Sequence, residues 1–136
     1  MILAVCLDNS GGMAFCGRRQ SRDRMQRQAL LERCRDRKLW MNGASAALFD
    51  GAEAAITVAE DFLERSGPGE VCFVEDRDIA PWAEAAEAII VYRWNRDYPA
   101  TVRCTVDLTG APWRLTGRRE FPGSSHETIT EEVYER

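Results

Sequence analysis

Short apolar runs recur through the first two thirds of the chain and predict buried strands. Residues 2–7 form the first run, and the polar, glycine-containing segment that follows predicts a turn. Further strands are predicted at residues 39–41, 54–58, 71–74 and 89–94. Helices are predicted between them, at residues 23–35, 45–49, 60–65 and 81–88. This alternation predicts an α/β domain with a mainly parallel central sheet and helices on both faces.

The last third of the chain follows a different pattern. Residues 102–108 and 128–134 alternate between apolar and polar positions, and residues 113–121 are predicted to be extended. The turn residues Pro122-Gly123-Ser124-Ser125 join the last two segments, which predicts a C-terminal antiparallel hairpin at the edge of the sheet. We also expect that this hairpin could support a homo-oligomer, because an edge strand has free backbone groups.

Composition and length favour one globular domain over residues 1–136. The chain is 45% hydrophobic and 29% charged, which is typical of a folded protein and too apolar for a disordered one. No apolar run approaches the roughly 20 residues that a membrane-spanning helix needs. No basic region precedes the first apolar run, so no signal peptide is predicted, and we expect a cytoplasmic protein with no membrane partner.

Positive charge is concentrated in one segment, from Gly17 to Lys38. This segment holds eight arginines and one lysine against three acidic residues, a net charge of +6. Because the whole chain carries −4, the remaining residues carry −10. Such a layout favours a local anion site, or a basic face that docks on an acidic partner, over a protein coated in nucleic acid.

An apolar first strand, a long loop, an acid near the start of the first helix, alternating α/β units and a terminal hairpin together resemble the dihydrofolate reductase fold. Residues 1–7 and the turn Gly11-Gly12-Met13 resemble that family's first strand and the start of its mobile active-site loop. Asp23 falls near the family's substrate-binding carboxylate, which holds the pterin ring. Residues 39–43 and Ser45 resemble the strand and helix start where family members bind cofactor phosphates.

The chain departs from this family directly after the predicted strand at residues 71–74. The family has adjacent glycines there, which let backbone amides approach the cofactor pyrophosphate, whereas this chain has Glu75-Asp76. Two carboxylates would repel a dinucleotide. The sequence therefore predicts no cofactor and no ordinary NADPH-dependent reductase; a divergent pterin or folate reductase is an alternative, and whether the protein is an enzyme stays open.

The chain also resembles a group of short bacterial proteins that carry the label ribonuclease Z. The nuclease of that name needs a His-x-His-x-Asp-His cluster to hold two metal ions, and His126 is the only histidine here. The motifs give that label no support, and no metal site is predicted.

The leading hypothesis is a small-ligand-binding protein whose ligand is anionic or heteroaromatic. Arg18, Arg19 and Arg22 would bind the anion, because guanidinium groups donate paired hydrogen bonds to oxyanions. Asp23 would accept hydrogen bonds from a ring or amine, and the resemblance adds Asn42 and Ser45 to the site.

Alternatives remain open for each part of this site. The arginines could form a solvated helix face, or a surface that binds RNA or a protein, with nucleic acid the less favoured partner. Asp23 could simply cap a helix. His126, next to Ser124 and Ser125, is attributed to turn chemistry and not to a catalytic triad, because neighbours in sequence rarely form one.

Overall fold

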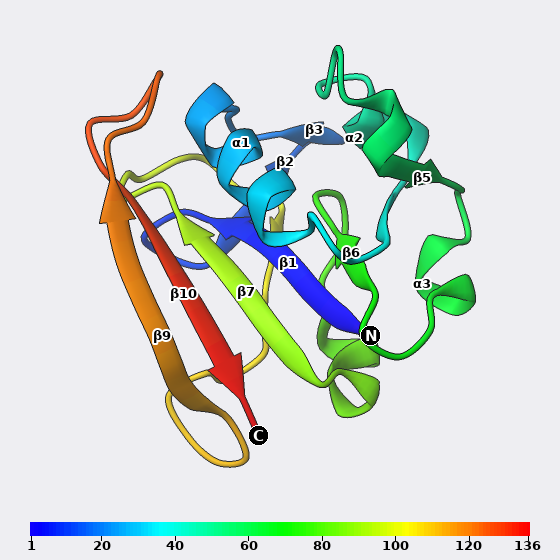
Figure 1. Ribbon diagram of the computed structural model, residues 1–136. Coiled ribbons are helices and arrows are strands. Elements are labelled where there is room, and N and C mark those ends of the chain that lie inside the picture. Colours follow the sequence, from blue (N-terminus) through cyan, green and yellow to red (C-terminus); the bar gives the residue numbers. More distant parts are fainter.

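The computed structural model describes residues 1–136 as a twisted seven-stranded sheet with a small three-stranded sheet beside it (Figure 1). The strand order in the large sheet is β5-β4-β6-β1-β7-β10-β9. Its strands are β1 (Ile2–Leu7), β4 (Leu39–Met41), β5 (Ile56–Val58), β6 (Val71–Phe73), β7 (Ala88–Arg93), β9 (Arg114–Phe121) and β10 (Ile129–Glu135).

The five strands from the first two thirds of the chain run parallel, with β1 between β6 and β7. Leu3 is in register with Cys72 on one side and with Ile89 on the other. Strand β10 then runs antiparallel to β7, and β9 runs antiparallel to β10 at the edge of the sheet. The predicted mainly parallel sheet and the C-terminal antiparallel hairpin are both confirmed.

Each face of this sheet is covered by a separate apolar core, and β1 contributes to both. Ile2, Ala4 and Cys6 face one core, while Leu3, Val5 and Leu7 face the other, because successive side chains of a strand point to opposite faces. A strand buried on both faces needs the unbroken apolar run that the sequence shows.

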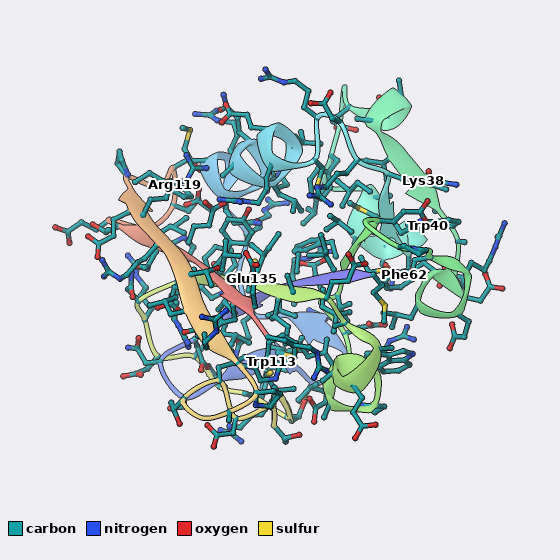
Figure 2. All side chains as sticks on the ribbon, turned by 60° about the horizontal axis from the view of Figure 1, so that its bottom comes forward. Lys38, Trp40, Phe62, Trp113, Arg119 and Glu135 are labelled. Carbon is teal, nitrogen blue, oxygen red and sulfur yellow. The ribbon has the colours of Figure 1, made fainter.

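Helix α1 (Arg24–Arg33) covers the first face, where its Ala29 and Leu30 join the core. The second face is covered by α3 (Phe62–Arg65), by the 3-10 helix η2 (Ala80–Ala85) and by part of the small sheet. In Figure 2, Trp40 and Phe62 lie together on this second side, and Trp113 lies at its other end.

The remaining elements are shorter than predicted. Helix α2 (Gly43–Ala46) follows directly after its cap, Asn42, and ends three residues before the predicted helix end at residue 49. The predicted strand at 54–58 divides into the 3-10 helix η1 (Glu53–Ala55) and β5. The segment 81–88 forms η2 instead of a longer α-helix, and β7 already begins at Ala88.

The long loop after β1 is the main feature that the sequence analysis missed. It folds back as a hairpin of β2 (Gly12–Phe15) and β3 (Arg18–Arg19), to which β8 (Val102–Arg103) adds a third strand. Of the strand predicted at residues 102–108, only Val102 and Arg103 form a strand, which pairs with β2. Strands β2 and β3 pair locally, whereas β8 comes from a distant part of the chain, so local patterning does not reveal the third strand.

A buried carboxylate ties the C-terminal end of α1 to the terminal hairpin. Glu131 of β10 is 1% exposed and accepts hydrogen bonds from Arg33 of α1 (2.8 Å), Arg119 of β9 (2.6 Å) and the Tyr92 hydroxyl of β7 (2.8 Å). Burial by itself raises the pKa of Glu131, but these three donors outweigh it and lower the pKa overall. The Glu131 side chain is therefore ionised, and its hydrogen bonds hold α1 against the terminal hairpin.

The outer edge of the sheet is strand β9, which pairs only with β10. Its exposed side chains include Arg114, Arg118 and Arg119, and edge charges of this kind protect against uncontrolled strand pairing. The homo-oligomer predicted through this hairpin stays a prediction. None of the helices has the length and apolar composition that crossing a membrane requires.

Candidate functional site

A cavity of about 750 Å³ opens where the β2–β3 hairpin, the start of α2 and the segment after β6 meet. The main chain brings these parts together because β4 and β6 are adjacent parallel strands, so the segments that follow them lie at the same edge of the sheet. The cavity is lined by Ala14, Gly17, Arg18, Arg19, Ser21, Arg22, Asn42, Ala44, Ser45, Glu75, Asp76, Val102 and Ser125.

Five of the six residues proposed from the sequence line this one cavity. Arg18 and Arg19 belong to β3, and Arg22 lies just before α1. Asn42 and Ser45 stand at the start of α2, where the Asn42 side chain accepts a hydrogen bond from the Ser45 N–H (2.9 Å). This cap holds both side chains at the rim of the cavity.

Glu75 and Asp76 also line the cavity, and both are neutralised by neighbours. The Arg19 guanidinium donates to the Glu75 carboxylate at 3.1 and 3.2 Å, and the Ser45 hydroxyl donates to it at 2.6 Å. Asp76 is paired with Arg77 at 3.0 Å. The Glu75–Arg19 ion pair therefore joins two parts of the cavity wall, whereas Asp76 is paired with its neighbour in sequence.

Arg18 and Arg22 differ from Arg19 in having no partner. Neither guanidinium takes part in a hydrogen bond or an ion pair in the structure, and both residues are exposed. Three arginines and two carboxylates line the cavity, so the lining has a net charge of +1, and Arg18 and Arg22 are its two arginines without a partner. The cavity therefore attracts anions.

Asp23, the sixth proposed residue, does not line this cavity. It is 1% exposed and caps α1, accepting from the N–H groups of Met25 (2.9 Å) and Gln26 (3.3 Å). The N–H groups of Ser124 (3.0 Å) and Ser125 (2.8 Å) donate to the same carboxylate. With this many donors already bound, Asp23 holds the 122–125 turn against α1 and does not face the cavity.

The Asp23 carboxylate has one further partner, His126, whose Nδ1 lies 3.0 Å from Oδ2. Burial favours a raised pKa for Asp23, but the hydrogen bonds from Ser124, Ser125 and His126 outweigh it and hold the pKa well below its usual value. The carboxylate therefore stays ionised over the whole physiological pH range.

The other ring nitrogen of His126 reaches two hydroxyl groups. Nε2 lies 3.1 Å from the Ser21 Oγ and 2.9 Å from the Tyr98 hydroxyl, which in turn donates to Ser21 at 3.3 Å. The imidazole is buried and stacks on Trp94, with ring centroids 4.5 Å apart and an interplanar angle of 16°. Ser21 is the member of this group that lines the cavity.

This arrangement is not evident from the sequence. There, His126 is grouped only with its neighbours Ser124 and Ser125, whereas the structure joins it to Ser21 and Asp23, more than 100 residues away. The available signal was a single histidine in a turn and a Ser-x-Asp pair at a helix start, and neither says that the two meet.

Comparison with known proteins identifies the architecture. The chain is similar to the solved structure of "Dihydrofolate reductase from Enterococcus faecalis complexed with NADP(H)and RAB-propyl", with a TM-score of 0.65 over 100% of this chain and 96% of that one. The fold is that of dihydrofolate reductase. Sequence identity to that enzyme is 12%, so the likeness concerns the fold. No known protein family matches the sequence, and no curated protein matches it.

The dihydrofolate reductase fold agrees with the resemblance drawn from the sequence. The structural match covers the whole chain and includes the parallel strands and the terminal hairpin, as the sequence predicts. In this version of the fold, the segment after β6 presents Glu75 and Asp76 to the cavity, and Glu75 is bound by Arg19 and Ser45.

Proposed function

We propose that the protein binds a small anionic molecule, bearing a carboxylate or phosphate group, in the 750 Å³ cavity. The observation that carries the proposal is the pair of unpartnered guanidinium groups, Arg18 and Arg22, in the wall of that cavity. Guanidinium groups bind such oxyanions through paired, charge-assisted hydrogen bonds.

The size and lining of the cavity favour a small polar ligand. Its volume lies in the range of small-molecule sites. Among the lining residues only Ala14, Ala44 and Val102 are hydrophobic, and no aromatic side chain is present for a ring to stack on. Of the two ligand classes expected from the sequence, these features favour the anionic over the heteroaromatic one.

The paired groups next to these arginines provide a rigid frame. Glu75 is held by Arg19 and Ser45, and Asn42 donates to Asp76 at 3.3 Å. A side chain fixed in this way keeps its position when a ligand enters, so little conformational entropy is lost on binding.

The experiment is a titration of the ¹⁵N-labelled protein with succinate and with inorganic phosphate, followed by NMR. We expect at least one of the two to bind, with shifts at β3, at the start of α2 and around Arg22. Arg18→Ala and Arg22→Ala should each weaken that binding at least about tenfold, as expected when a charge-assisted hydrogen bond worth about 1.5–3 kcal/mol is lost.

Arg35→Ala is the matched control. Arg35 is an exposed arginine of the same basic segment and does not line the cavity, so its replacement removes the same charge without touching the site. Equal losses from Arg35→Ala and Arg18→Ala would contradict the proposal and support a diffuse basic face that binds RNA or an acidic protein. Tight binding of NADPH in the same assay would support the reductase alternative.

A further inference from the structure

We infer that Ser21 is a nucleophile that His126 activates, and that the protein transfers acyl groups, hydrolysing esters whose acyl part is anionic. The inference rests on the proposed function, because the arginine-lined cavity would hold the acyl carboxylate. It goes beyond that function by assigning a reaction to the site.

The geometry is that of a nucleophile, a base and a group that orients the base. His126 Nε2 is 3.1 Å from Ser21 Oγ, and His126 Nδ1 is 3.0 Å from Asp23 Oδ2. Both distances lie within the hydrogen-bonding range that such a relay requires. Serine, histidine and aspartate combine in this way on unrelated folds, so the arrangement is defined by geometry and not by position in the sequence.

The surroundings of His126 determine which nitrogen carries the proton. An ionised Asp23 carboxylate accepts only, so in a neutral imidazole the Nδ1–H donates to it and Nε2 is the nitrogen that accepts. Stacking on Trp94 fixes the ring plane, and both nitrogens therefore stay aimed at their partners. A neutral imidazole with an acceptor toward Ser21 is the form a general base needs.

Of the two hydroxyl groups near His126 Nε2, only that of Ser21 belongs to a residue that lines the cavity; Tyr98 does not line it. Ser21 lines the anion cavity together with Arg18 and Arg22. The Tyr98 hydroxyl lies 2.9 Å from Nε2 and 3.3 Å from Ser21 Oγ, and when its single proton is donated to Ser21 Oγ, the serine proton is free to point at His126.

The reaction proceeds in two balanced steps. Ser21 Oγ attacks the ester carbonyl carbon while its proton passes to His126 Nε2; the C–O bond to the alcohol breaks, and the alcohol leaves with that proton. Water then attacks the acyl-serine and gives a proton to Nε2. The C–Oγ bond breaks, Ser21 recovers that proton, and the acid is released. One of the two unpaired arginines, Arg18 or Arg22, would hold the acyl carboxylate, and the other would stabilise the negative charge that develops on the carbonyl oxygen.

The test compares the hydrolysis of 4-nitrophenyl hemisuccinate, which has an anionic acyl part, with that of 4-nitrophenyl acetate. We expect the wild-type protein to prefer the hemisuccinate, and Ser21→Ala to lower kcat at least about 100-fold, the range that nucleophile and general-base chemistry supplies. Ser10→Ala is the control, because Ser10 is exposed and lies outside the cavity. Unchanged turnover in Ser21→Ala overturns the inference.

Asp23 is a positioning residue, and its test must separate chemistry from folding. Asp23→Asn should lower kcat for the hemisuccinate while leaving KM within about threefold, because the cavity wall is intact but the imidazole loses its orienting charge. A proportional loss of kcat and of folded protein, with unaltered kcat per folded molecule, contradicts this role.

A second variant provides a readout that does not depend on the choice of ester. In Ser21→Cys, His126 would withdraw the thiol proton, so iodoacetamide should alkylate residue 21 at pH 6 at least about tenfold faster than the cysteine of Ser10→Cys. Equal rates overturn the inference. The anion titration is independent: succinate binding that Ser21→Ala retains, with turnover also retained, would remove the reaction but not the binding site.

Discussion

The two ends of helix α1 are each fixed by a buried carboxylate, and the two carboxylates do different things. Asp23 at the N-terminal end and Glu131 beside the C-terminal end are both 1% exposed, and each accepts hydrogen bonds from several donors. In both, hydrogen bonding outweighs burial and lowers the pKa. Burial and charge alone do not distinguish them.

The two carboxylates differ in whether one of their hydrogen-bond donors can also accept a proton. Glu131 binds Arg33, Arg119 and Tyr92, which hold their protons firmly, so the network ends there. Asp23 binds backbone N–H groups and one imidazole, whose second nitrogen reaches Ser21 in the cavity wall. A buried carboxylate thus becomes part of a reactive site when one of its partners can itself accept a proton.

The largest stability change should follow removal of the Asp23 side chain. Asp23→Ala leaves the N–H groups of Ser124 and Ser125 and the His126 ring without their acceptor, and we expect a loss of about 3–5 kcal/mol in the free energy of unfolding. Urea denaturation measures it. Asp36→Ala, at an exposed position in the same segment, should change stability by less than about 0.5 kcal/mol.

Glu131→Gln should destabilise the fold less than Asp23→Ala does and should leave ester hydrolysis unchanged. Its partners Arg33 and Arg119 are 37% and 50% exposed and can turn to water, so we expect a loss of about 1.5–3 kcal/mol. Hydrolysis of 4-nitrophenyl hemisuccinate by the folded variant should match the wild type. A loss of turnover as large as that of Asp23→Asn would remove the distinction between the two carboxylates.

Gly123 tests how closely the turn must approach Asp23. A Cβ at this position would lie 2.5 Å from Asp23 Oδ2 and 2.6 Å from the His126 carbonyl oxygen, so Gly123→Ala must displace the turn. We expect a loss of about 1–3 kcal/mol, together with slower turnover. Gly67→Ala is the control, since a Cβ there meets nothing nearer than 3.6 Å.

Acid should weaken the protein through both carboxylates. Because their pKa values are lower in the folded than in the unfolded state, each stabilises the fold above its unfolded pKa of about 4. That contribution is lost as the pH falls further, by up to about 1.4 kcal/mol per pH unit for each group. Urea midpoints measured from pH 6 to pH 2 should therefore fall less steeply in Glu131→Gln than in the wild type.

The sequence predicts most of the sheet and five residues that line the cavity, but not the group around His126. Uninterrupted apolar runs such as residues 2–7 and 71–74 predict strands because burial on both faces demands them. The pairing of β2 with β8 and the contact between His126 and Asp23 join distant segments, which composition and local spacing do not encode. The arginines show the same limit: Arg18, Arg19 and Arg33 look alike in sequence, yet Arg19 and Arg33 are paired with carboxylates and Arg18 is not.

The most direct test of the central claim is to identify the residue that becomes acylated. The protein is mixed briefly with 4-nitrophenyl hemisuccinate, quenched in acid and analysed by peptide mass spectrometry. The account predicts one succinyl group on the peptide that contains Ser21, absent in Ser21→Ala and reduced in Arg18→Ala. Acylation confined to lysine or the N-terminal amine, or unchanged labelling of that peptide in Ser21→Ala, would contradict it.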